Sequence, residues 1–136
     1  MKKLNLLSSF PKSKRNLKNR KISKKNIKLA LKYSKEYFDG TRAQGYGGYY
    51  YDGRWVAVAR KLINRFDLKS KNRFLDIGCA KGFLMHDLYT INPKIKVYGV
   101  DISNYAIKNA LPSVRKKIKK INCKKIPYNK NFFDCV

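Results

Sequence analysis

The stretch FLDIGCAKGF, Phe74 to Phe83, decides the fold of this chain. A short apolar run ends at Asp76, glycines follow at positions 78 and 82, and a helical pattern begins after them. Glycine lets the backbone turn tightly and lets a ligand approach without a Cβ in the way. The helix that follows offers free N–H groups and the positive end of its dipole. The stretch therefore predicts a cradle for a nucleotide-like ligand at the carboxyl end of a strand.

Patterns of strand and helix alternate from residue 71 onward. Apolar runs predict strands over 73–77, 95–100 and 118–123 and the beginning of a fourth over 132–136. Helical spacing between them predicts helices over 81–91 and 103–110, the second capped by Ser103 and bent or restarted at Pro112. Such alternation is typical of an α/β fold with a parallel sheet and helices on its faces.

The part of the chain before residue 71 has a different character. Residues 1–24 are basic and polar, which predicts a mobile arm. Residues 25–70 form a helical, Gly-Tyr-rich segment, with amphipathic helices predicted over 26–38 and 55–66. We therefore divide the chain into the arm, this N-terminal segment and a ligand-binding domain over 71–136.

The charge of the chain admits two explanations. The net charge is +25, and the first 32 residues hold twelve Lys or Arg and no Asp or Glu. Such a charge favours phosphate-bearing partners by long-range attraction, which suggests nucleic-acid contact through residues 1–32. A composition biased toward Lys, Asn and Ile raises the charge in the same way without any partner.

Length and cysteine usage limit the class of protein. A chain of 136 residues suits one domain with a core of its own. Its three cysteines form no C-x-x-C pair, so we expect reduced thiols in a cytoplasmic protein and no metal site. The opening MKKLNLLSSF has too short an apolar run for a signal peptide, and no window reaches the length of a membrane span.

The identity of the ligand is left open by the glycine loop alone. The pattern D-x-G-x-A-x-G differs from the G-x-G-x-x-G of dinucleotide folds, which disfavours an NAD-dependent enzyme. Asp101 ends the next strand, and a carboxylate there accepts hydrogen bonds from ribose hydroxyls. The purely structural alternatives are that the glycines only join a strand to a helix and that Asp101 only caps a helix.

Three segments in order and spacing carry a family resemblance. LDIGCAKGF, GVDISNYAIKNA and NCKKIPYNKNFFDCV resemble the first three conserved segments of class I S-adenosylmethionine-dependent methyltransferases. Upstream, YFDGTRAQGYGGYYYDGRW resembles a segment that precedes the cofactor domain in a bacterial subgroup of these enzymes. The resemblance implies a Rossmann-like, doubly wound parallel sheet with an N-terminal helical extension.

The resemblance also implies that the sheet is incomplete. The family's sheet has seven strands in the order 3-2-1-4-5-7-6, and this sequence provides strands 3-2-1-4. We therefore expect an N-terminal fragment that binds S-adenosylhomocysteine weakly or not at all and shows no turnover.

The same resemblance implies a role for eight residues in cofactor binding. Gly78, Ala80 and Gly82 would pass beside the methionine part, and Asp76 would orient its amino group. Asp101 would hold the ribose of the adenosine part, and Ile102 would pack on the adenine face. Asn122 would contact the adenine amino group, and the backbone of Cys123 would contact the adenine ring. Ala80 stands where the family usually has glycine, a minimal change unless the backbone there needs a positive φ. Asn122 replaces the usual Asp and can still accept a hydrogen bond.

The stretch GYGGYYYDGRW, residues 45–55, is interpreted as a lid or acceptor site. Tyrosine faces attract cations such as a sulfonium, and an arginine can meet a carboxylate. The candidates are Tyr46, Tyr49, Tyr51, Arg54 and Trp55. A tyrosine-rich hairpin packed on the domain and a stacking platform for nucleic acid are the open alternatives.

The predicted function is methyl transfer from S-adenosylmethionine to an undetermined acceptor, with a small molecule favoured. No catalytic residue is assigned, because an in-line displacement needs positioning and exclusion of water more than a general base. The alternatives are an RNA-modifying or nucleic-acid-binding protein that uses its basic arm, and a non-catalytic fragment.

Overall fold

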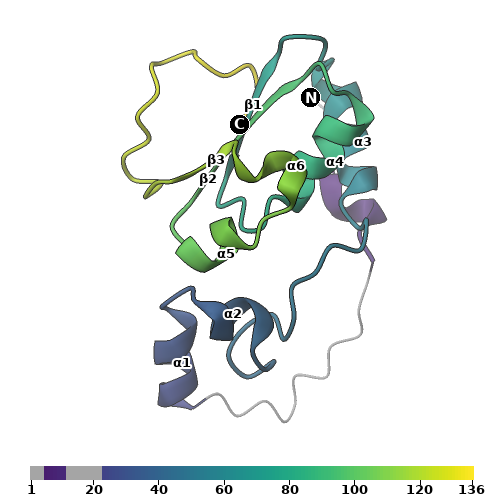
Figure 1. The fold of residues 1–136 in the computed structure, drawn as a ribbon. Helices are drawn as coiled ribbons and strands as arrows, with labels where there is room; N and C mark the ends of the chain where they lie inside the picture. Colours follow the sequence, from purple (N-terminus) through teal and green to yellow (C-terminus); the bar gives the residue numbers. More distant parts are fainter. Residues whose placement is uncertain (1–4, 12–22) are drawn as a thin grey trace.

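Three parallel strands form the centre of the structure. The computed structural model describes residues 5–11 and 23–136. Strands β1 (Arg73–Ile77), β2 (Lys96–Asp101) and β3 (Ile118–Lys120) form one parallel sheet in which β2 lies in the middle (Figure 1). Helix α4 (Phe83–Ile91) connects β1 to β2, and α5 (Asn104–Lys108) and α6 (Pro112–Arg115) connect β2 to β3. The α/β class and the three strands are confirmed, although β3 is shorter than the predicted 118–123.

The fourth predicted strand, 132–136, is wrong as a regular strand. Only one isolated parallel bridge forms, between Phe74 and Cys135, on the edge of β1 that β2 leaves open. The Asp134 carboxylate accepts a hydrogen bond of 2.6 Å from the Arg73 backbone N–H. A side chain thus takes a donor that a fourth strand would use, and the pairing stops at one bridge.

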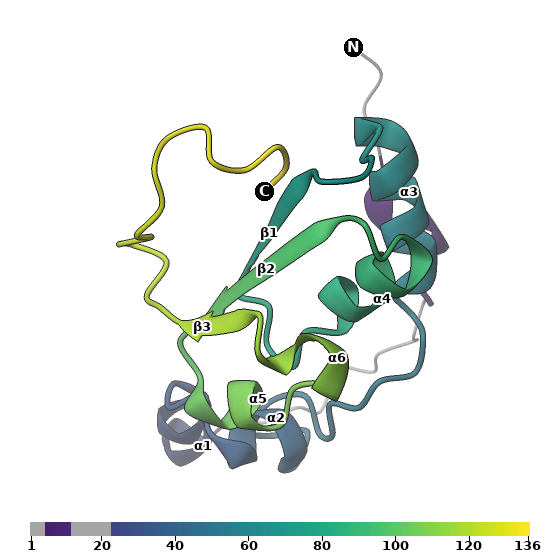
Figure 2. The same cartoon turned by 45° about the horizontal axis from the view of Figure 1, so that its top comes forward.

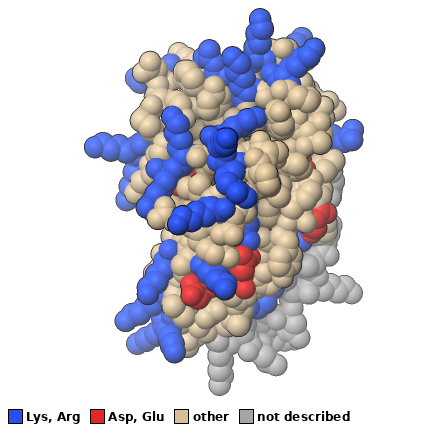
Figure 3. All heavy atoms as spheres, viewed as in Figure 1, with Lys and Arg blue, Asp and Glu red and all other residues tan. Residues whose placement is uncertain are grey.

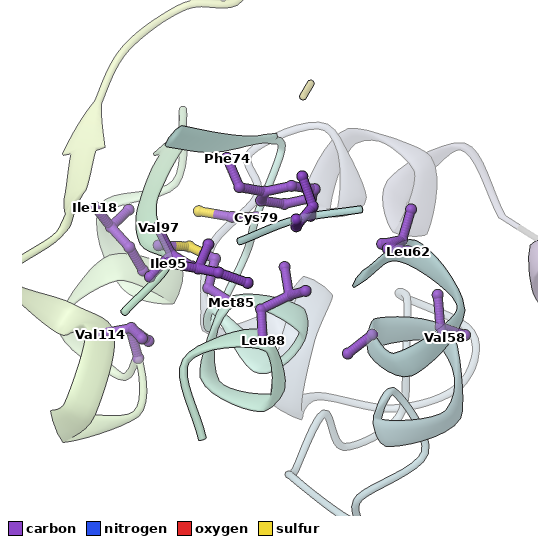
Figure 4. Close-up of a cluster of buried hydrophobic side chains, with 13 residues drawn as sticks. Val58, Leu62, Phe74, Cys79, Met85, Leu88, Ile95, Val97, Val114 and Ile118 are labelled. Carbon is purple, nitrogen blue, oxygen red and sulfur yellow. The ribbon is translucent and has the colours of Figure 1, made fainter. Parts of the chain in front are cut away.

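The core lies between the sheet and two helices on one of its faces. Helix α3 (Val56–Phe66) packs against α4, and both cover the same side of the sheet (Figures 1 and 2). Val58 and Leu62 from α3 point toward Met85 and Leu88 from α4 (Figure 4), and both α4 side chains are fully buried. Among the described residues, no helix has the length and apolar character needed to cross a bilayer.

The predicted single helix over 26–38 is wrong. Two short helices form instead, α1 (Lys24–Ala30) and α2 (Lys35–Asp39), and α2 contacts α5 beyond the end of the sheet (Figures 1 and 2). The break falls at Tyr33, whose φ of 48° is left-handed. The Tyr33 carbonyl accepts a hydrogen bond of 2.5 Å from Ser103 Oγ. This long-range contact holds the backbone out of the helix that local spacing favours.

The predicted mobile arm, 1–24, is partly wrong. Leu6–Ser9 form a short 3-10 helix, η1, that contacts α3. The Phe10 ring lies edge-on to Trp55, with ring centroids 5.0 Å apart. Leu6 and Phe10 are apolar anchors that pack against the main core, so residues 5–11 belong to the folded domain. Residues 1–4 and 12–22 lie outside the described part of the chain.

Candidate functional site

A cleft of about 400 Å³ lies beyond the carboxyl ends of β1 and β2. The strand ends and the loops after them contribute nine of its lining residues, among them Gly78, Ala80, Asp101, Ile102, Asn122 and Cys123. Parallel strands end at the same edge of a sheet, so the loops that follow them meet there. The cleft is large enough for a nucleoside-sized ligand. These six are also six of the eight residues that the sequence assigned to a cofactor.

The two glycines of the loop after β1 face different surroundings. Both have left-handed backbones, with φ of 77° at Gly78 and 73° at Gly82. A Cβ added to Gly78 would meet no heavy atom within 4 Å, so this side of the loop is open. A Cβ added to Gly82 would lie 2.8 Å from Val114 Cγ2 and 3.1 Å from Ile118 Cδ1. Gly78 therefore leaves room beside the cleft, whereas Gly82 is explained by helix packing and does not line the cleft.

Ala80 is held in a conformation that favours glycine. Its φ is 49°, which costs a residue with a Cβ about 1–2 kcal/mol. Its N–H donates a hydrogen bond of 2.7 Å to Asp101 Oδ2, which helps to hold the loop in place. The replacement of the family's usual glycine by alanine is therefore not neutral, because this position needs a positive φ.

The Asp101 carboxylate joins the ends of two elements. It is only 8% exposed and accepts hydrogen bonds of 2.7 Å from the backbone N–H groups of Ala80 and Ser103. Ser103 Oγ in turn caps α5 by accepting from the Ala106 N–H at 3.0 Å. A carboxylate has about four lone-pair positions, so two remain for a ligand hydroxyl. Asp101 thus lines the cleft and holds two loops together, while the helix cap that the sequence left as its alternative role is supplied by Ser103.

Asp76, in β1, is partly buried and does not line the cleft. Burial raises the pKa of its carboxyl to about 6, and the negative charge of Asp101 adds to the effect. Within the described part of the chain its side chain makes no hydrogen bond. A carboxyl without a partner in this position favours a cationic group from a ligand.

Aromatic side chains of the N-terminal segment form the wall opposite the strand ends. Tyr33, Tyr37, Phe38 and Tyr46 all line the cleft. The Tyr46 ring lies 5.9 Å from Phe38 in a stacked arrangement and 4.4 Å from Tyr49. Of the predicted lid residues, Tyr46 therefore lines the cleft, and Tyr49 contacts Tyr46 without lining the cleft itself. The sequence analysis did not identify Tyr33, Tyr37 and Phe38 as site residues, because their spacing was assigned to an amphipathic helix.

The other lid candidates have partners elsewhere. Tyr51 donates a hydrogen bond to buried Asp87, an interaction that raises the pKa of the tyrosine to about 12. Arg54 pairs with Asp52 at 2.5 Å on the surface. Trp55 packs edge-on against Phe10, next to η1. None of the three lines the cleft, and their role as lid or acceptor residues stays a prediction.

A family comparison identifies the domain that contains the glycine loop. A family model described as "Methyltransferase domain" matches residues 68–136, half of the chain, and the chain belongs to this family. This confirms the prediction of a methyltransferase domain. The bacterial subgroup suggested by the upstream segment stays a prediction.

Three solved structures are similar to part of this chain. An S-adenosylmethionine-dependent methyltransferase from Aquifex aeolicus is 29% identical with a TM-score of 0.41, over 51% of this chain and 40% of that one. The plantazolicin methyltransferase BpumL in complex with SAH is 19% identical with a TM-score of 0.37, over 65% and 38%. The same enzyme with a monoazolic desmethylPZN analog and SAH is 20% identical with a TM-score of 0.38, over 65% and 38%. The chain thus spans about two fifths of the length of these proteins. A comparison with curated proteins found no match.

Proposed function

We propose that the cleft binds S-adenosylmethionine and that the chain serves methyl transfer to a small-molecule acceptor. The observation that carries the proposal is the cleft itself, at the carboxyl ends of β1 and β2 and lined by six residues assigned to the cofactor from sequence. The order β1-β2-β3, with the Cys135 bridge on the free edge of β1, supports strands 3-2-1 and the start of 4 of a seven-stranded sheet. S-adenosylmethionine would supply an electrophilic methyl group on its sulfonium.

The adenosine half of the ligand is assigned to the loops after β2 and β3. Asp101 has two lone-pair positions left for the ribose hydroxyls. Ile102 is 50% exposed beside the cleft, which suits an apolar contact with the adenine face. Asn122 and the backbone of Cys123 lie where the adenine edge would meet them.

The methionine half is assigned to the loop after β1. The open side of Gly78 leaves room for the ligand, and Ala80 lies beside it in the lining. Asp76, whose carboxyl lacks a hydrogen-bond partner among the described residues, is assigned to the ligand's amino group. The aromatic wall would keep water away from the reacting methyl group, an effect that favours displacement.

Amide chemical shifts in a ¹⁵N-labelled sample titrated with S-adenosylhomocysteine test the proposal. The method detects weak binding and shows where it occurs. We expect the amides of Gly78, Ala80, Ile102, Asn122 and Cys123 to shift together. An unchanged spectrum at saturating ligand, or shifts confined to other parts of the chain, would contradict the proposal and favour a non-catalytic fragment.

A matched pair of isoleucine variants sharpens this test. Ile102 and Ile27 are similarly exposed, at 50% and 48%, so truncation of either costs little stability. Ile102→Ala removes the apolar contact assigned to adenine, and we expect affinity to fall about fivefold to tenfold. Ile27→Ala on α1 is the control and should bind as the unmodified chain does.

Contact with nucleic acid through residues 1–32 is kept as a prediction about partners. In the described part of this range, Lys24, Lys25, Lys28 and Lys32 flank a groove on α1. Figure 3 shows Lys and Arg spread over one face of the molecule, with far fewer Asp and Glu. A small-molecule acceptor and a cytoplasmic location remain part of the proposal.

A further inference from the structure

Lys81 is a buried lysine within the glycine loop, and each of the three hydrogens of its ammonium group has an acceptor. The residue is 7% exposed. Its Nζ lies 2.8 Å and 2.7 Å from the two carboxylate oxygens of Asp39 and 2.8 Å from the Tyr49 carbonyl oxygen. An ammonium group has three hydrogens, so all three are used by the N-terminal segment. A loop of the cofactor domain is thereby tied to a segment that precedes it by about forty residues.

The Asp39 carboxylate accepts further hydrogen bonds besides those from Lys81. It accepts a hydrogen bond of 2.7 Å from the Tyr105 hydroxyl on α5 and one of 3.1 Å from the Tyr49 backbone N–H. Burial alone would raise the pKa of Asp39, but the hydrogen bonds from Lys81 and Tyr105 outweigh it and the pKa is lowered. The Asp39 carboxylate is therefore ionised at neutral pH, and its hydrogen bonds join three parts of the chain.

The residues next to Asp39 form the aromatic wall of the cleft. Phe38, directly before it, is 3% exposed and packs against Ala80 and Ala106. The Tyr46 N–H donates to the Tyr37 carbonyl at 2.9 Å, and the Gly48 N–H donates to the Phe38 carbonyl at 3.1 Å. These bonds fold the segment back on itself, so the position of Asp39 sets the position of the wall.

We propose that the Lys81–Asp39 ion pair is a latch that holds the aromatic wall against the glycine loop and so sets the affinity of the cleft for its ligand. Lys81 is a positioning residue in this account, since it does not line the cleft. The inference rests on the proposed function for the nature of the ligand, but the latch itself is a property of the chain. A wall that closes only one tenth of the time would weaken apparent affinity about tenfold.

Two readouts on the full chain test the latch separately from the proposed function. Lys81→Met keeps the length of the side chain and removes the charge. We expect hydrogen exchange at the Tyr46 and Gly48 amides to become about 100-fold faster, while amides in β2 change by less than about threefold. The affinity for S-adenosylhomocysteine, from the shift titration, should fall about tenfold.

The control is the same substitution at an exposed ion pair. Lys69 bonds Asp67 at 2.6 Å with both side chains more than 70% exposed, so Lys69→Met should leave exchange and affinity unchanged. If Lys81→Met fails to fold, Asp39→Asn, which keeps an oxygen toward the lysine, serves for both readouts.

The possible results separate the two ideas. Faster exchange at the wall amides without ligand binding by the unmodified chain supports the latch and contradicts the proposed function. Unchanged exchange at the wall, a uniform rise across all amides, or unchanged affinity in a chain that does bind would each overturn the latch.

Discussion

The two glycines of the loop after β1 lead to opposite expectations when alanine replaces them. Both backbones are left-handed, so either variant takes on about 1–2 kcal/mol of strain. Alanine also restricts the unfolded chain more than glycine does, which offsets about 0.4–1 kcal/mol. Backbone conformation alone therefore lowers the free energy of unfolding by about 1 kcal/mol in Gly78→Ala and in Gly82→Ala.

Packing then separates the two variants. The new Cβ at position 82 would lie 2.8 Å from a methyl group of fully buried Val114, and overpacking of a core costs about 1–3 kcal/mol. Gly82→Ala should thus lower the free energy of unfolding by about 2–4 kcal/mol in total. The new Cβ at position 78 meets nothing within 4 Å and adds no such cost, but it occupies space beside the cleft. We expect Gly78→Ala to weaken binding of S-adenosylhomocysteine about tenfold.

Urea unfolding followed by the fluorescence of Trp55, the single tryptophan, measures the first effect. The shift titration with S-adenosylhomocysteine measures the second. If Gly82→Ala is as stable as Gly78→Ala, the predicted clash between a Cβ at position 82 and Val114 is refuted. If Gly78→Ala binds as tightly as the unmodified chain, the ligand does not pass along this side of the loop.

Three further outcomes follow from the surroundings of single side chains. Tyr51→Phe removes the hydrogen bond to buried Asp87 and should lower the free energy of unfolding by about 1–3 kcal/mol, whereas Tyr50→Phe, on a residue 73% exposed, should stay within about 0.5 kcal/mol. Ser103→Ala removes the cap of α5 and should cost about 1–2 kcal/mol in the same urea assay. The folded pKa of Asp76 is raised to about 6, so its contribution to stability is present below about pH 4 and lost as the pH rises through about 6. Urea unfolding between these pH values should show a fall of about 1–3 kcal/mol that is absent in Asp76→Asn, and parallel pH curves for the two proteins would refute the assignment.

The strands and the strand-end residues of the cleft are predictable because their signals are local. The apolar run over 73–77 and the glycine after it define β1 with its observed bounds. The run that ends at Asp101 defines β2 within one residue. Once the strands are parallel, their carboxyl ends must share an edge of the sheet, and the residues after them follow into one place.

The wall of the cleft has no such local signal. Helical spacing over 26–38 is real, but the contact between Ser103 and the Tyr33 carbonyl, 70 residues apart, overrides it. Asp39 reads as the first half of an Asp-Gly turn, and its ion pair with Lys81 exists only after the N-terminal segment has docked on the sheet. Tertiary contacts of this kind routinely override local preference, which is why the wall and the latch were missed.

The bonds that shape the cleft are also bonds that stabilise the fold, and this affects the choice of probe. Asp101 accepts from the N–H groups of Ala80 and Ser103, so its removal leaves two buried donors unsatisfied as well as a ligand contact missing. A loss of binding in an Asp101 variant would therefore not separate recognition from a rearranged loop. Ile102, half exposed and free of such structural bonds among the described residues, reports on the ligand alone. Its truncation is thus the more decisive test of where the adenine lies, even though the aspartate is the more prominent residue of the motif.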